Sequence, residues 1–425
     1  MTFGRKLVNM HPAKRDGRFL HGGALGTFSA VSCRGFTRLA NVRRKPCGVP
    51  MNSDERRAAR RARREIARAE KRAARIEGCT LEAVADIDNL YRAAMLAKRG
   101  VAWKASVQRY HKDLLRNVVK ARADLLAGKD IRRGFHEFQL FERGKLRQIS
   151  SVHFSERVIH KSLTQNALTP ALAPSFIRDN TANLAGRGTD DALRRLKAQL
   201  ARHYARHGSD GYILLADFSN YFANIAHAPL KEIVGRALDD RRVADLTNSL
   251  IGACGDVGLG LGSEPNQVMA VGFPSALDHY VVEMLGVEAY GRYMDDSYFI
   301  HESKDYLSVV LGLVTQKCDQ LGIEVNRKKT HIVKLSHGFT FLKKRISYGE
   351  NGRIVVRPCR ASITRQRRKL KKMARMVADG TMDIEQVRCS YQSWRGGMKR
   401  LDAHRTVLSM DALYRSLFGR DPNQR

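Results

Sequence analysis

Two adjacent carboxylates interrupt an apolar, aromatic stretch of the chain, AYGRYMDDSYFIH, at residues 289–301. Strand interiors disfavour aspartate, so we expect Asp295 and Asp296 to lie at a tight turn between two short strands. The two acids repel one another unless a cation compensates them, and Mg²⁺ takes carboxylate oxygens readily. An acidic tip on a surface hairpin is the alternative, and the rest of the chain has to decide between the two.

A third carboxylate, Asp217, ends an apolar strand predicted in GYILLADFSNYF, residues 211–222. Alone, this aspartate could merely cap the following turn. Together with Asp295 and Asp296 it could hold two divalent ions roughly 3.5–4 Å apart. Such ions lower the pKa of an attacking hydroxyl and neutralise a leaving pyrophosphate, which is the chemistry of nucleotidyl transfer.

The overall charge indicates the class of partner. Lys and Arg number 76 against 42 Asp and Glu, a formal net charge of +34. This excess predicts a polyanionic partner, most simply nucleic acid. No apolar run approaches the ~20 residues of a membrane span. An anionic membrane surface is the alternative partner, but no strongly amphipathic basic helix with bulky apolar residues supports it, so no membrane partner is expected. The seven cysteines are scattered without a C-x-x-C pair, which indicates a reducing, intracellular setting.

Residues 1–50 contain ten basic residues and one acid. We expect a basic, disordered extension there. An organelle presequence, or an upstream extension of a reading frame that begins at Met51, are the alternatives.

The region 51–134 is predicted to be basic and helical. Its stretch 55–75 has ten basic residues and three acids, and its apolar positions are nearly all alanine. It therefore predicts a solvated helix, with Ser53 or Asp54 as N-cap, that lies along a phosphate backbone.

Beyond residue 80 the pattern is mixed α/β. It predicts helices over 272–285 and 303–322 and a strand over 338–346. Two more helices are expected after Arg360, with a break at Asp379–Gly380.

The tetrapeptide YMDD at 293–296 resembles the signature of reverse transcriptases, and six further blocks of that family appear in the expected order. These blocks are FERGKLRQISSVHFSERVIHKSL (141–163), NTANLAGRGTDDALRRL (180–196), ADFSNYF (216–222), GLGLGSEPNQ (258–267), NRKKT (326–330) and GFTFLKKR (338–345). The resemblance implies an α+β right-hand polymerase. Fingers and palm, the latter an antiparallel sheet packed on helices, would span 135–345, and a helical thumb would span 346–425.

The resemblance also implies roles for individual residues. Asp217, Asp295, Asp296 and the backbone of Phe218 would bind two Mg²⁺ ions, with Mn²⁺ as an alternative. The residues that would contact the nucleotide or the primer are Lys145, Arg147, Phe222, Gly262, Gln267, Tyr293 and Lys329. In isolation the basic residues among them would be ordinary solvated side chains, and Phe222 an ordinary core residue.

Each of these contacts has a stated task. Lys145 and Arg147 would grip phosphates from the fingers, and Lys329 would act as a general acid to the departing pyrophosphate. Phe222 would exclude a 2′-hydroxyl and so select deoxynucleotides. Gly262 and Gln267 would lie against the incoming base pair, and Tyr293 under the primer end.

The first helix predicted after Arg360 supplies a grip on duplex. Residues 360–378 include eight basic residues and no acid. Arg365, Arg368 and Lys372 are expected to contact the phosphates of a template–primer duplex.

The implied activity is RNA-directed DNA synthesis from deoxynucleoside triphosphates on a DNA or RNA primer. Untemplated or protein-primed DNA synthesis and a non-catalytic RNA-binding scaffold are the alternatives. The compact plan resembles stand-alone bacterial or phage enzymes of the bacterial cytoplasm, for which a dedicated non-coding RNA is a candidate partner. The lack of a VTG near VVRPCR (355–360) departs from retron enzymes, and Asn266 before Gln267 departs from the commoner Ser-Gln ending of the glycine-rich turn. Both departures favour the defence-associated or an otherwise unclassified group.

Overall fold

The computed structural model describes residues 52–142 and 145–422, so the extension predicted over 1–50 lies outside the described residues. The chain divides into two units, residues 1–64 and 65–425. Helix α1 (Ser53–Glu77) begins in the first. Its N-cap is Asn52, not Ser53 or Asp54 as predicted: the Asn52 side chain accepts a 2.7 Å hydrogen bond from the Glu55 amide, and the Glu55 carboxylate accepts one from the Asn52 amide.

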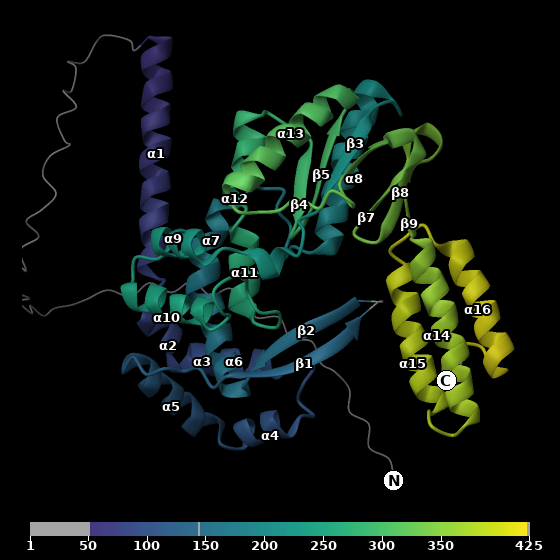
Figure 1. The fold of residues 1–425 in the computed structure, drawn as a ribbon, viewed down its shortest axis with the longest axis horizontal. Helices are drawn as coiled ribbons and strands as arrows, with labels where there is room; N and C mark the ends of the chain where they lie inside the picture. Colours follow the sequence, from purple (N-terminus) through teal and green to yellow (C-terminus); the bar gives the residue numbers. More distant parts are fainter. Residues whose placement is uncertain (1–51, 143–144, 423–425) are drawn as a thin grey trace, which may run out of the picture. The chain divides into compact units, whose positions relative to one another are not determined.

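After α1, the chain forms the helices α2 to α6 and the β1–β2 hairpin of the second unit (Figure 1). The helices are α2 (Leu81–Ala85), α3 (Ile87–Ala97), α4 (Ala105–Lys112), α5 (Leu114–Leu126) and α6 (Phe154–Leu163). The fingers hairpin consists of the antiparallel strands β1 (Phe135–Glu142) and β2 (Lys145–Val152).

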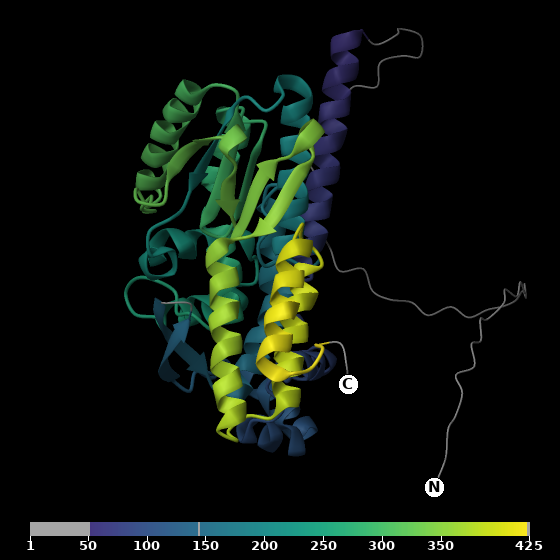
Figure 2. The ribbon, with the colours of Figure 1, turned by 90° about the vertical axis from the view of Figure 1, so that its right-hand side faces the viewer.

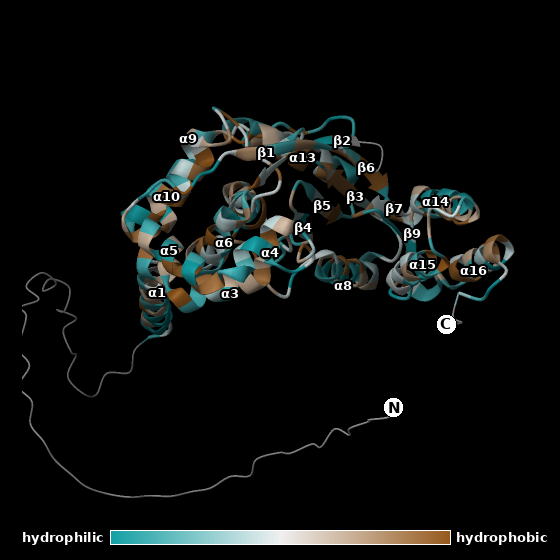
Figure 3. Ribbon diagram, turned by 90° about the horizontal axis from the view of Figure 1, so that it is seen from below, coloured by the Kyte–Doolittle hydropathy of each residue, from teal (hydrophilic) through white to brown (hydrophobic). Residues whose placement is uncertain are grey.

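The palm sheet has four antiparallel strands in the order β4-β5-β3-β6. They are β3 (Tyr212–Ala216), β4 (Tyr290–Tyr293), β5 (Asp296–His301) and β6 (His331–Lys334). Helix α8 (Thr189–His207) covers one face and α13 (Lys304–Gln320) the other (Figure 3). Ile213 and Leu215 pack on the α8 side, and Leu214 and Ala216 on the α13 side, so β3 is apolar at every position.

Further helices complete the palm. They are α7 (Thr169–Leu172), α9 (His227–Ala237), α10 (Arg241–Gly252), α11 (Glu264–Gly272) and α12 (Ser275–His279). The helix predicted over 272–285 begins only at Ser275, after Pro274, and passes into a π-helical turn over Tyr280–Met284. The helix predicted over 303–322 is confirmed as α13, with Ser303 as its N-cap.

A second sheet has the order β7-β8-β9. Its strands are β7 (Phe339–Phe341), β8 (Lys344–Tyr348) and β9 (Ile354–Pro358). The single strand predicted over 338–346 is therefore wrong. Leu342 and Lys343 both adopt positive φ, 46° and 61°, and close a two-residue hairpin that Asn-Gly or Asp-Gly usually signals.

Three thumb helices lie side by side (Figure 2). They are α14 (Arg360–Ala378), α15 (Ile384–Met398) and α16 (His404–Phe418); only the first two were predicted. Leu370, Tyr391 and Tyr414 form their shared core. Leu401 lies beyond the end of α15 and packs against a buried cluster that includes Leu196 of α8 and Val356 of β9. None of the helices in residues 52–142 and 145–422 combines the length and apolarity of a membrane span.

Candidate active site

The two adjacent aspartates lie at the turn between β4 and β5, as predicted. Tyr293 pairs with Asp296 across the hairpin, so Met294 and Asp295 form a two-residue loop. Met294 adopts a φ of 57°, in the left-handed region that costs an L side chain energy. The hairpin geometry, rather than a strand interior, therefore accommodates both acids.

Sheet register brings Asp217 to the same place. β3 pairs with β5 so that Ala216 lies opposite Ser297, and one further residue along this register sets Asp217 opposite Asp296. Asp217 is only 6% exposed. Its carboxylate accepts hydrogen bonds from Lys329 Nζ at 2.6 and 2.7 Å and from Asn326 Nδ2 at 3.1 Å.

The three carboxylates act electrostatically on one another. Burial raises the pKa of Asp296 to about 7, and the charges of Asp295 and Asp217 add to this rise. The pKa of Asp295 is also raised, first by burial and then by Asp217, while the charges of Lys329 and Arg147 oppose the rise. Burial alone would lower the pKa of Lys329, but its hydrogen bond to Asp217 and the charges of the three acids raise it. The three carboxylates thus produce a region of negative potential, and the charges of the nearby cations balance it only in part.

This potential predicts a pH-dependent cost in stability. The pKa of Asp296 is raised from 3.8 to about 7 in the folded protein. The folded state therefore binds the extra proton, and stability falls as pH rises through that window. In EDTA at about pH 8 we expect Asp296→Asn to melt about 2 °C or more above the wild type, with the gap closing near about pH 4. Thermal melts at the two pH values check this; a gap that does not change with pH would contradict it.

The three carboxylates are suitable ligands for divalent cations. Their oxygens are hard ligands of the kind that Mg²⁺ prefers. Among the described residues no three His, Cys, Asp or Glu side chains form a ready-made metal cluster, and both oxygens of Asp217 accept hydrogen bonds from Lys329. Lys329 therefore competes with a cation for the Asp217 oxygens, each of which can accept more than one partner. Phe218, whose backbone was predicted as a further ligand, pairs with Val325 in an isolated bridge.

The glycine-rich turn is held against two other segments. The Gly258 amide donates to Ile225 and the Leu259 amide to Phe222, at 2.8 and 2.7 Å. A Cβ on Gly258 would lie 2.6 Å from the Ala223 carbonyl oxygen. On the other side the Ser150 amide of β2 donates to the Leu261 carbonyl at 3.1 Å. The turn therefore connects the fingers hairpin to the segment that follows Asp217.

Gly262 and Gln267 lie beside the same cavity. Gly262 has a φ of +123°, and a Cβ there would lie 3.1 Å from the Ser150 carbonyl oxygen. Both residues line a cavity of about 200 Å³ that Arg157 and Lys161 of α6 also line. Arg157 and Lys161 therefore place positively charged groups beside the glycine-rich turn.

Two aromatic side chains predicted to contact substrate are half-buried near the carboxylates. Phe222 packs against the palm core with its ring 5.9 Å from that of Tyr221, edge to face. Tyr293 immediately precedes the Met294–Asp295 loop, and burial raises its pKa. Phe222 follows Asp217 by five residues, and Tyr293 precedes Asp295 by two.

The predicted cations divide between the fingers and the thumb. Arg147 of β2 lies close enough for its charge to lower the pKa of Asp295, whereas the Lys145 side chain lies outside the described residues. Arg365, Arg368 and Lys372 are exposed on α14, on a face turned away from its buried residues Gln366, Leu370 and Met373.

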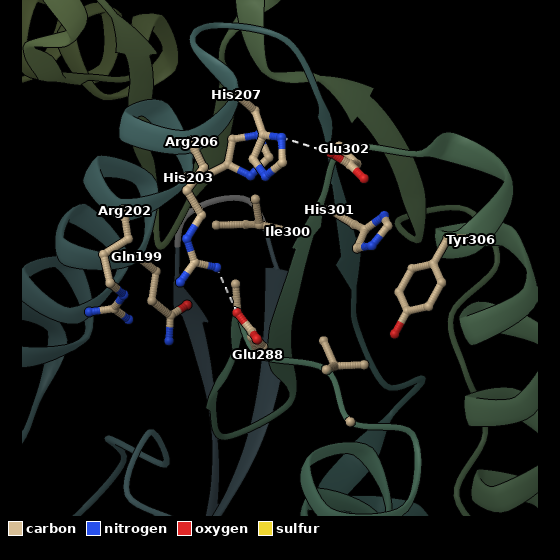
Figure 4. A pocket seen from close by; sticks show the side chains of 13 residues that line it. Gln199, Arg202, His203, Arg206, His207, Glu288, Ile300, His301, Glu302 and Tyr306 are labelled. Atoms are coloured by element: carbon tan, nitrogen blue, oxygen red, sulfur yellow. Dashed lines mark hydrogen bonds and ion pairs between the residues drawn. The ribbon is translucent and has the colours of Figure 1, made fainter.

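Another cavity is a separate site. It has a volume of about 340 Å³ and lies between α8 and the C-terminal end of β5 (Figure 4). Ion pairs of Arg206 with Glu288 and of His207 with Glu302 lie along it. Asp296 is at the other end of β5, so this cavity is not part of the carboxylate site.

Three residues near the acids were missed. Asn326 donates to Asp217, Lys343 lowers the pKa of Asp296, and Arg292 contacts the Met294 carbonyl. Asn326 and Lys343 lie within blocks singled out in the sequence, and Arg292 directly precedes YMDD. The sequence blocks that contain or adjoin them could be recognised, but a single Asn, Lys or Arg forms no sequence pattern that indicates which residue it contacts.

Comparison with known proteins agrees with this architecture. A family model described as reverse transcriptase (RNA-dependent DNA polymerase) matches residues 133–346. No curated protein matches the chain. Among solved structures, apo telomerase from Candida tropicalis, truncated from the C-terminal domain, is similar with a TM-score of 0.43 and 14% identity. That match covers 52% of this chain and 54% of the telomerase chain, so this chain spans about half of that protein's length. Because the family model covers half of the chain, the protein belongs to the reverse transcriptase family.

Proposed function

We propose that this protein is an RNA-directed DNA polymerase that adds deoxynucleotides to a primer 3′-hydroxyl on an RNA template. The observation that carries the proposal is the convergence of Asp217 with the Asp295–Asp296 turn, beside the cations Lys329 and Arg147, in a chain of the reverse transcriptase family. The site thereby combines hard oxygen ligands with groups that bind phosphate.

Each residue has a proposed task in this reaction. Asp217, Asp295 and Asp296 would hold two Mg²⁺ or Mn²⁺ ions, which when bound supply the Lewis acidity that nucleotidyl transfer needs. Lys329 exchanges Asp217 for the triphosphate and protonates the departing pyrophosphate. Arg147 holds the phosphates from the fingers hairpin, together with Lys145.

The remaining residues select and orient the nucleic acid and the nucleotide. Phe222 excludes a 2′-hydroxyl, Tyr293 supports the primer end, and Gly262 with Gln267 contacts the new base pair. Arg365, Arg368 and Lys372 bind backbone phosphates of the duplex, a contribution that salt weakens. The domain limits 51–134, 135–345 and 346–425 belong to the same proposal.

The biological setting is a further part of the proposal. We place the protein among stand-alone bacterial or phage enzymes, in the cytoplasm, with a role in anti-phage defence and a possible dedicated non-coding RNA. Among the described residues, Cys254, Cys318, Cys359 and Cys389 are free thiols, which agrees with a reducing compartment.

Nucleotide incorporation by the purified protein tests the activity. With Mg²⁺, an RNA template and an annealed DNA primer, we expect products whose sequence is directed by the template. Products that form equally well without template would favour untemplated synthesis. No incorporation under any priming scheme, with RNA binding retained, would overturn the proposal in favour of a scaffold.

A further inference from the structure

Arg292, which immediately precedes the YMDD hairpin loop, is an arginine buried in the palm. It is 1% exposed, and its Nη2 and Nε donate to Asp278 at 2.6 and 2.8 Å. Asp278 is fully buried and also accepts a 2.7 Å hydrogen bond from the Tyr290 hydroxyl. Well-packed apolar residues often stabilise a fold as well as a buried ion pair does. Stability alone therefore does not account for a guanidinium at this position.

The same guanidinium reaches the loop that carries the aspartates. Arg292 Nη1 donates to the Met294 carbonyl at 2.9 Å, and Nη2 donates to the Val271 carbonyl at the end of α11 at 3.0 Å. The Arg292 backbone is held as well, because its amide donates to the Asp179 carbonyl and its carbonyl accepts from the Thr181 amide, each at 3.1 Å. The Arg292 side chain thus ties the loop to α11 and α12, and its backbone ties the same strand to the segment of Asp179 and Thr181.

Met294 is the strained residue of this loop. Its φ of 57° is one that hairpin turns ordinarily assign to glycine. A non-glycine residue persists in such a conformation only where its surroundings over-determine it. The hydrogen bond from Arg292 to the Met294 carbonyl is such a constraint, and the carbonyl it holds belongs to the peptide that joins Met294 to Asp295.

We propose that Arg292, oriented by Asp278, is a positioning residue that holds the Met294–Asp295 peptide and thereby orients the Asp295 carboxylate toward a divalent cation. The inference rests on the proposed function for the reaction that this orientation serves. It also predicts a property that can be measured without nucleic acid or nucleotide, namely the affinity of the free protein for Mn²⁺.

The test compares Mn²⁺ binding and nucleotide incorporation in the full chain. Arg292→Met removes the donors while keeping a long side chain. We expect Mn²⁺ affinity, measured by calorimetry, to fall about 10–100-fold. We expect kcat to fall on the order of 10²-fold with little change in KM for the nucleotide. Arg292→Lys is the milder variant, because it keeps the positive charge. It should still lose Mn²⁺ affinity, because one ammonium group cannot reproduce the four side-chain hydrogen bonds of the guanidinium.

Met294→Gly supplies a rescue that a merely structural role of Arg292 would not produce. Glycine adopts positive φ without steric cost, so the loop should depend less on Arg292. We expect Arg292→Met/Met294→Gly, and likewise Arg292→Lys/Met294→Gly, to recover most of the lost Mn²⁺ affinity. The melting temperature and Mn²⁺ affinity of Met294→Gly alone supply the reference for these double variants.

A similar trio in the thumb provides the matched control. Arg395 donates to Asp411, which also accepts from the Tyr391 hydroxyl at 2.7 Å. Arg395→Met should lower the melting temperature without changing Mn²⁺ affinity.

Three results would overturn the inference. The first is an Arg292→Met or Arg292→Lys protein that binds Mn²⁺ as the wild type does. The second is a failure of Met294→Gly to restore affinity to either variant. The third is a wild type that binds no Mn²⁺ through Asp295. A wild type that binds Mn²⁺ as expected but incorporates no nucleotide would instead overturn the proposed function and leave the inference standing.

Discussion

Replacing Asp295 and Asp296 by asparagine should lower the rate of nucleotide incorporation on the order of 10³-fold. The pKa of each acid is raised by burial and by a neighbouring carboxylate, so their negative charge is concentrated where a divalent cation would relieve it. Asparagine keeps the shape of the side chain but removes that charge. Single-turnover incorporation with Mg²⁺, on an RNA template with a DNA primer, measures the effect.

The matched control is Asp245→Asn. Asp245 is an exposed acid on α10, in a 3.7 Å contact with Arg241, and its replacement should leave the rate unchanged. Melting curves of all variants in EDTA distinguish loss of catalysis from loss of folding, because the active-site variants should be at least as stable as the wild type at about pH 8. Substantial incorporation by the double variant would show that the reaction does not use these two acids.

Phe222→Ala should let the protein incorporate ribonucleotides, reducing its preference for deoxynucleotides roughly 10–200-fold. The ring of Phe222 is half-buried against Tyr221. The backbone carbonyl of Phe222 accepts a 2.7 Å hydrogen bond from the Leu259 amide. The segment that follows Asp217 is therefore held against the glycine-rich turn. Removing the ring opens space where a 2′-hydroxyl would otherwise collide. The ratio of kcat/KM for the two sugar types, with the same base, measures the change.

Phe222→Tyr is the control for this prediction, because it keeps the bulk of the ring and should retain the preference for deoxynucleotides. A change in kcat/KM that is equal for both sugar types would indicate a general disturbance of the palm. Unchanged discrimination in Phe222→Ala would show that another side chain excludes the 2′-hydroxyl.

Local patterns were sufficient for much of the fold. The apolar run before Asp217 is a strand, and α13 and the first two thumb helices follow the apolar periodicity of their residues. Asp295 and Asp296 were placed at a turn because aspartate is disfavoured inside strands. The predictions failed where the usual turn residues are absent. Leu342 and Lys343 close a hairpin without glycine or asparagine, and the resulting two strands were taken for one.

The sequence by itself determined which side chains could do chemistry here. Three aspartates, a glycine-rich turn and a lysine block occur in an order that identified the family before any coordinate was known. Only the tertiary structure decided how these groups are held. Lys329 pairs with Asp217 across 112 residues, and the Arg292–Asp278 pair reaches the Met294 carbonyl from inside the palm. Spacing along a chain encodes periodicity and turns, whereas the partner of a single charged side chain depends on which distant segments pack beside it.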